Sequence, residues 1–193
     1  INDYEAYEEV LELVENVSPS LRNRVEYFNK DYNIFEYCHI ETAIARALAR
    51  KVWLKCGGYL IIDKTEALTV IDVNTGKYVG RNCLEDTVLR TNIEAAKEIA
   101  KQIRLRDIGG IIVIDFIDIN EQEHQSMVLD TLREALQKDR TKTSVVGMTG
   151  LGLIEMTRKK VRQELSSLIN VECPHCDGTG RILSPEDLAD NIE

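Results

Sequence analysis

No stretch of this 193-residue chain approaches the length of a membrane-spanning helix, and its amino end lacks the basic-then-apolar pattern of a secretion signal. Internal repeats and low-complexity segments are absent as well. The composition, 44% hydrophobic and 30% charged, is instead typical of a globular protein with one good core. Because the chain begins with isoleucine and an acidic segment, we expect it to be a piece of a longer protein.

An excess of positive charge is also missing, since 33 acidic residues outnumber 24 Lys and Arg residues and give a net charge of -9. That sign is wrong for a protein that holds nucleic-acid phosphates over its whole surface. The basic residues are unevenly placed, however, so a local basic surface on an acidic body is open. Candidates for phosphate contacts are Arg140, Lys142, Arg158 and Lys159. Taken singly, each is better explained as part of a solvated helix or strand face.

Two aspartates lie at the ends of apolar runs. Asp72 ends the run that begins at Leu68, and Asp115 ends the run that begins at Gly109. An ionised carboxylate inside a β-branched strand is costly unless it is paired or binds a metal, so these two residues predict a divalent-cation site. Because side chains alternate faces along a strand, Asp118 should point away from Asp115 and is interpreted as a bystander or helix-start residue.

Carboxylate oxygens suit Mg²⁺, which takes few protein ligands and keeps several waters. Asn74 shares a strand face with Asp72 and could donate a hydrogen bond that fixes its carboxylate. The alternative is that each aspartate only caps a strand or turn. The turn-rich sequence that follows Asp72 gives that alternative about equal weight at this residue.

The five cysteines, an odd number, include one close pair, Cys173 and Cys176. This usage predicts a reduced, cytoplasmic protein in which the pair has a metal or redox role. A CxxC supplies two of the four ligands of a structural Zn²⁺ site, and no second CxxC exists. The same motif in a second copy of the chain would complete the site and link a homodimer. A redox pair normally opens a helix, so the Asp-Gly-Thr-Gly that follows favours zinc, with a redox pair or a metal-free turn as alternatives.

The periodicity of apolar residues predicts the order of the elements. Expected are a helix over 39–51, hairpin strands over 59–62 and 67–73, a helix over 84–105, a strand over 111–117, a helix with Asn120 at its N-cap, and strands over 143–148 and 153–157. The strand over 111–117 is almost wholly apolar, as in a strand covered on both faces. This order predicts the α/β class, a mixed sheet with flanking helices. If the strands that carry the two aspartates are neighbours, their carboxylates could share one ion.

Six segments follow one another along the chain in a specific order. They are Gly57-Gly58-Tyr59, Ile71-Asp72-Val73-Asn74, Thr91-Asn92-Ile93-Glu94, Arg104-Leu105-Arg106-Asp107-Ile108-Gly109-Gly110, Ile114-Asp115-Phe116-Ile117-Asp118 and Cys173-Pro174-His175-Cys176. With these segments the chain resembles the bacterial ribonuclease E/G family, from about residue 30 to about residue 182. The resemblance implies an endoribonuclease that hydrolyses single-stranded RNA with Mg²⁺ to 5′-phosphate products in RNA processing and decay.

The resemblance also implies roles for particular residues and segments. The family's magnesium-binding aspartates fall on Asp72 and Asp115, its supporting asparagine on Asn74, and the cysteines of a zinc link between two protomers on Cys173 and Cys176. It assigns residues 1–35 to the remnant of a preceding RNase H-like subdomain, 36–50 to a connector helix, 51–165 to a DNase I-like catalytic subdomain, and 166–193 to the zinc-link and tail.

The family's S1 RNA-binding domain and its 5′-monophosphate sensor lie upstream of the matching region and are absent from this sequence. We therefore expect this chain alone to bind metal and zinc but to cleave RNA poorly, in keeping with its acidic charge. Two other functions stay open at this point. One is a non-catalytic, zinc-linked dimerisation or RNA-scaffold module, and the other is a phosphoesterase that acts on another substrate.

Overall fold

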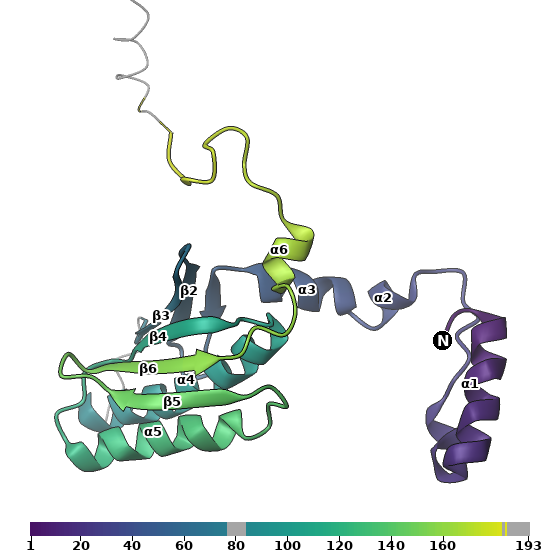
Figure 1. Cartoon of the computed structure of the whole chain (residues 1–193), viewed down its shortest axis with the longest axis horizontal. Helices are drawn as coiled ribbons and strands as arrows, with labels where there is room; N and C mark the ends of the chain where they lie inside the picture. The colour runs from purple at the N-terminus through teal and green to yellow at the C-terminus, as the bar shows by residue number, and fades with distance from the viewer. Residues whose placement is uncertain (77–83, 183, 185–193) are drawn as a thin grey trace, which may run out of the picture. The chain divides into compact units, whose positions relative to one another are not determined.

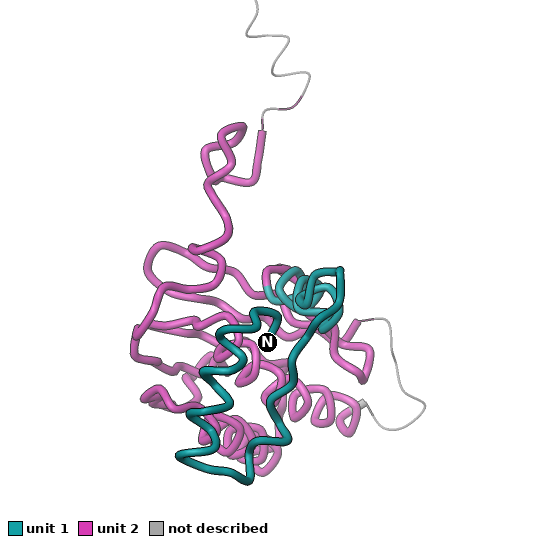
Figure 2. The backbone as a smooth tube through the Cα atoms, turned by 90° about the vertical axis from the view of Figure 1, so that its right-hand side faces the viewer, with its two compact units in different colours: residues 1–47 teal, residues 48–193 magenta. Residues whose placement is uncertain are grey.

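The computed structural model describes residues 1–76, 84–182 and 184. It divides into two compact units, residues 1–47 and 48–193 (Figure 2). Most of the tail that was assigned with the zinc-link lies outside the described residues. Among the helices that are described, none combines the length and apolar character needed to cross a membrane.

The first unit is built from short helices. These are α1 (Tyr4–Val17), the 3-10 helix η1 (Pro19–Arg24), α2 (Ile34–Tyr37) and α3 (Ile40–Leu48). Asp3 begins α1 by accepting a hydrogen bond from the backbone N–H of Ala6 at 2.8 Å. The boundary between the units follows Ala47, so most of the helix that was expected to be a connector belongs to the first unit.

A six-stranded sheet forms the centre of the second unit (Figure 1). Its strands are β1 (Lys51–Trp53), β2 (Tyr59–Lys64), β3 (Leu68–Asn74), β4 (Gly110–Asp115), β5 (Thr143–Met148) and β6 (Leu153–Arg158), in the order β1-β2-β3-β4-β6-β5. All neighbouring strands are antiparallel except β3 and β4, which are parallel because α4 (Leu84–Leu105) carries the chain back between them. The predicted mixed α/β sheet with flanking helices is confirmed.

Helices α4 and α5 (Gln122–Leu136) pack together on one face of the sheet (Figure 1). Core side chains of β3 and β4 face these helices, and Ile71, Ile112 and Ile114 are fully buried. On the opposite face, in the described part of the chain, Ile111 is 50% exposed. The prediction that the strand over 111–117 is covered on both faces is therefore wrong. Its apolar run continues past the end of β4 into a loop, which periodicity cannot distinguish from strand.

The start of α5 also differs from the prediction. Glu121, and not Asn120, occupies the N-cap, and it makes no side-chain capping hydrogen bond. The entry to the helix is held instead by Gln125, whose side chain donates to the carbonyl oxygen of Ile119 at 2.7 Å. A short helix, α6 (Leu165–Ile169), follows the last strand.

Candidate metal centre

The parallel register of β3 and β4 places Asp72 directly beside Asp115. Each residue lies near the carboxyl end of its strand, and neighbouring strands are about 4.8 Å apart. Because side chains alternate, and Ile71, Val73 and Ile114 point into the core, both aspartates point to the open face of the sheet. The condition for a shared ion, that the strands carrying the two aspartates are neighbours, is therefore met.

Burial alone does not require a metal here, because Asp72 is only half-buried and Asp115 is exposed. The negative charges of the two carboxylates, however, do require a positive partner. No Lys, Arg or His residue in the described parts of the chain forms an ion pair with either carboxylate. Two adjacent carboxylates without a cation disfavour their own ionised forms, so the arrangement calls for a positive ion or a proton.

A third carboxylate, Asp118, lines the same open pocket, which has a volume of about 560 Å³. Although Asp115 is exposed, the surrounding protein removes part of the hydration of its carboxylate, and this desolvation, followed by the negative charges of Asp72 and Asp118, raises its pKa above the ordinary value. The expectation that Asp118 points to the opposite face is wrong, because β4 ends at Asp115 and the alternation rule does not extend beyond it. Its interpretation as a bystander or helix-start residue stays a prediction. Asp118 is thus a candidate site residue that strand periodicity missed.

Two asparagines hold the backbone and side chains of this pocket. Asn74 donates from Nδ2 to Oδ2 of Asp72 at 2.7 Å, which is the hydrogen bond predicted from their spacing. Asn92 on α4 is fully buried, donates to the carbonyl oxygen of Ile117 at 2.8 Å and accepts from its N–H at 3.2 Å. These two bonds fix the loop that carries Asp118. Sequence spacing gave no signal for Asn92 because its partner belongs to another element.

The donor set fits Mg²⁺. Asp72 and Asp115 supply two oxygen ligands from neighbouring strands, and Asn74 orients one of them. Within the described ranges, no group of three or more His, Cys, Asp or Glu side chains is close enough to hold a metal. A site of two carboxylates is what Mg²⁺ ordinarily takes from a protein, with water and substrate phosphate filling its other positions.

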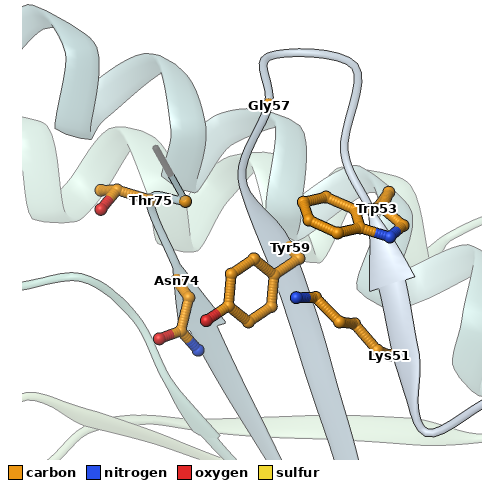
Figure 3. Close-up of a pocket in the computed structure, with 7 residues that line it drawn as sticks. Lys51, Trp53, Gly57, Tyr59, Asn74 and Thr75 are labelled. Atoms are coloured by element: carbon orange, nitrogen blue, oxygen red, sulfur yellow. The ribbon is translucent and has the colours of Figure 1, made fainter. Parts of the chain in front are cut away.

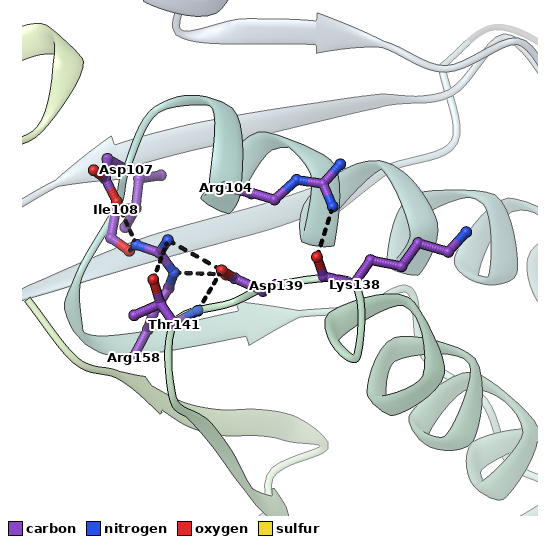
Figure 4. Close-up of polar contacts among 7 residues, drawn as sticks. All are labelled: Arg104, Asp107, Ile108, Lys138, Asp139, Thr141 and Arg158. Atoms are coloured by element: carbon purple, nitrogen blue, oxygen red, sulfur yellow. Dashed lines mark hydrogen bonds and ion pairs between the residues drawn. The ribbon is translucent and has the colours of Figure 1, made fainter. Parts of the chain in front are cut away.

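Arg158 has a structural role, and the prediction that it contacts phosphates is wrong. Its side chain is 3% exposed and forms ion pairs with Asp107 at 2.8 Å and Asp139 at 2.7 Å (Figure 4). It also donates to the carbonyl oxygen of Ile108 at 3.0 Å and to Oγ1 of Thr141 at 3.3 Å. These contacts occupy its guanidinium inside the protein, so it offers no surface to RNA.

The other three basic candidates, Arg140, Lys142 and Lys159, are exposed. They gather at the far end of the sheet, because the register of β4 with β6 pairs Asp115 with Leu153 but Gly110 with Arg158. Five residues of strand, about 17 Å, therefore separate the two ends. The structure does not bring these residues to the acid pair, and any contact they make with RNA would lie away from the metal centre.

Cys173 and Cys176 lie in a turn and not at the start of a helix. The N–H of Gly180 donates to Sγ of Cys176 at 3.3 Å. This backbone hydrogen bond outweighs burial and, with a contact from the Cys173 thiol, lowers the pKa of Cys176. A lowered thiol pKa suits a metal ligand. No other His, Cys, Asp or Glu side chain of the described residues joins the pair, which supplies two of the four ligands of a structural zinc site.

Comparisons with known proteins identify the family of this chain. The sequence pattern of the Ribonuclease E/G family matches residues 1–161. Ribonuclease G of Escherichia coli strain K12 is 48% identical over 186 residues, which cover 96% of this chain and 38% of that protein. Ribonuclease E of Haemophilus influenzae is 38% identical over 192 residues, which cover 100% of this chain and 20% of that protein. The chain thus spans well under half the length of these curated relatives, and it belongs to the ribonuclease E/G family.

Proposed function

We propose that this chain carries the metal centre of an endoribonuclease that hydrolyses single-stranded RNA with Mg²⁺, leaves 5′-phosphate products and acts in RNA processing and decay. The names of its relatives support cleavage of RNA. One observation carries the metal part of the proposal, namely the register that sets Asp72 beside Asp115 with no cationic side chain paired to either among the described residues.

In this proposal Asp72 and Asp115 hold the ion on the open face of the sheet, where a flexible single strand has access. A bound Mg²⁺ lowers the pKa of water and offsets the charge that develops on the phosphate during hydrolysis. Asn74 keeps the Asp72 carboxylate in one orientation, and Asn92 holds the loop that follows Asp115. Asp118 adds negative charge to the same pocket and so strengthens its attraction for a cation.

A cleavage assay with the purified chain tests this proposal and separates it from its rivals. Single-stranded RNA should be cut in Mg²⁺ to products with 5′-phosphates, single-stranded DNA of the same sequence should not be cut, and a chelator should stop the reaction. A slow rate is expected, because the relatives contain much additional sequence. Binding of RNA without cleavage at any Mg²⁺ concentration would favour a scaffold module, and equal cleavage of DNA would favour a broader phosphoesterase.

We also propose that Cys173 and Cys176 of two copies share one Zn²⁺ and join them as a homodimer. Four thiolates complete the tetrahedral site that two thiolates leave half-filled. We expect about one zinc ion per two chains, and a chelator should convert dimer to monomer in sedimentation. Cys173→Ser should abolish both zinc and dimer, whereas Cys38→Ser, a change at another exposed cysteine, should alter neither. Stoichiometric zinc on a monomer would contradict the shared site.

A further inference from the structure

We propose that Lys51, Trp53 and Tyr59 form a stacking site for a nucleobase of single-stranded RNA, beside the metal centre; we call these three residues the aromatic shelf. The inference rests on the proposed function, since it takes RNA as the substrate. It concerns a part of the open face that neither the acid pair nor the cysteine pair uses.

The sheet register places the aromatic shelf on the same face as the acid pair. Trp53 of β1 pairs with Tyr59 of β2, and Tyr59 pairs in turn with Asn74 of β3. Paired residues of neighbouring strands point to one face, so these three form a row across the sheet. Asn74 is also the residue that donates a hydrogen bond to Asp72, and the row therefore ends at the metal centre.

The side chains of the shelf residues lie next to one another (Figure 3). The Trp53 and Tyr59 ring centroids are 5.4 Å apart, and Nζ of Lys51 lies 4.1 Å from the first and 3.6 Å from the second. Trp53 is nevertheless 65% exposed. In a protein with few aromatic residues, a tryptophan that presents most of its surface to solvent, next to a lysine, has the composition of a base-stacking site.

The pocket beside the shelf and the pocket of the acid pair are separate but adjoin each other. The pocket beside Lys51, Trp53 and Tyr59 has a volume of about 710 Å³, and Asn74 and Thr75 line both this pocket and the one that holds the aspartates. Three strand spacings, about 14 Å, separate Lys51 from Asp115 across the sheet. An RNA strand whose scissile linkage lies at the metal centre can therefore place a nearby base, not the base at that linkage, on the shelf.

Contacts with α4 and β3 fix the loop between β1 and β2, which joins the two strands that carry the shelf. Glu94 of α4 accepts hydrogen bonds from the backbone N–H groups of Lys55 and Cys56. Gly58 packs so closely against β3 that a Cβ atom there would lie 2.7 Å from the carbonyl oxygen of Asn74. These contacts pre-position the shelf before any ligand binds, which lowers the entropic cost of binding.

Each shelf residue has a distinct part in this site. A nucleobase stacks on the exposed ring of Trp53, a contact that tolerates any base because every base has a flat face. Tyr59 supports the tryptophan ring from its edge. Lys51 provides a positive charge for the adjacent phosphate, and this charge is the basic contact that the far-end residues Lys142 and Lys159 cannot supply.

Because Trp53 is the only tryptophan of the chain, its fluorescence reports directly on the shelf. The chain should be titrated without added Mg²⁺, so that no cleavage occurs. The ligands are a short single-stranded RNA, the same strand lacking its bases, and inorganic phosphate. We expect the intact RNA alone to quench the fluorescence. No quenching by intact RNA, or equal quenching by the base-free strand, would overturn the inference.

Variants separate stacking from charge in a second assay, which follows binding by the fluorescence anisotropy of a labelled RNA. Trp53→Ala should weaken binding about tenfold, the usual scale for one stacked base, and Trp53→Phe should restore most of it. Lys51→Gln should weaken binding several-fold, whereas Lys142→Gln, a matched loss of charge at the far end of the sheet, should not. Unchanged affinity in Trp53→Ala, with an unaltered melting temperature, would refute the shelf.

Failure of the shelf can be told apart from failure of the proposed function. Asp115→Asn should leave the quenching intact, because the shelf does not use the metal. RNA cleavage without quenching would refute only the shelf. Quenching without any cleavage would support the shelf and count against the enzyme.

Discussion

Asp115→Asn is expected to slow RNA cleavage by on the order of 10³-fold at saturating Mg²⁺. The amide is neutral and cannot complete the pair of anionic oxygens that Asp72 and Asp115 present to one ion. Single-turnover cleavage of a labelled single-stranded RNA measures the effect, with a longer form of the protein as host if the rate of this chain is too low to follow.

A melting-temperature measurement would distinguish loss of the metal ligand from unfolding as the cause of slow cleavage. In the absence of divalent cations, Asp115→Asn should raise the melting temperature slightly, because Asp72 and Asp118 no longer face a like charge. Asp118→Asn is the matched control, since it removes a carboxylate from the same pocket but not from the adjacent pair, and its effect on cleavage should be much smaller. A near-normal rate in Asp115→Asn would contradict the proposed role.

Arg158→Met is expected to lower the free energy of unfolding by about 3–5 kcal/mol. The methionine approximates the length of the side chain but leaves Asp139, whose own side chain is 4% exposed, without its cationic partner. Asp107 and the carbonyl oxygen of Ile108 lose a donor as well. Urea unfolding followed by circular dichroism measures the change. A loss below about 1 kcal/mol would show that the cluster in Figure 4 does not stabilise the sheet.

Two neighbouring substitutions act as controls for this cluster. Lys159→Met, next in the chain but exposed, should change stability by less than about 0.5 kcal/mol. Arg158→Lys should retain only part of the stability lost in Arg158→Met. A lysine ammonium group is too compact to contact both Asp107 and Asp139, as the planar guanidinium group does.

The same cluster should make stability depend on pH. Burial acts to raise the pKa of Asp139, but hydrogen bonds from Arg158 and from the backbone N–H of Thr141 outweigh it, and the pKa is lowered overall. A carboxylate with a lowered pKa in the fold contributes stability above its unfolded pKa of about 3.9, and this contribution is lost as pH falls through the folded value. Acid should therefore destabilise the wild-type chain more than the variant Asp139→Asn.

Strongly periodic segments could be predicted from the sequence almost residue by residue. The stripe of apolar residues in α4 and the limits of β5 were both clear, because an uninterrupted pattern specifies one element. The position of β6 between β4 and β5 could not be predicted in this way. Strand order depends on packing between elements that are distant in sequence, and periodicity carries no information about it.

In the candidate site, too, local features of the sequence could be predicted and contacts between distant segments could not. Asp72 and Asp115 stood out because a charged residue interrupts an apolar run, and that signal is local. Asp118 could not be placed by alternation, because it lies beyond the end of β4. Arg158 follows Ile154 and Met156 in strict alternation, so its inward direction was predictable, but its acid partners were not.

Calorimetric titration of Mg²⁺ into the chain tests the central claim most directly. We expect one ion per chain at this site, with binding lost in both Asp72→Asn and Asp115→Asn and largely retained in Asp118→Asn. Mg²⁺ binding that survives in either of the first two variants would show that the two adjacent carboxylates do not share an ion, and the proposed metal centre would be wrong.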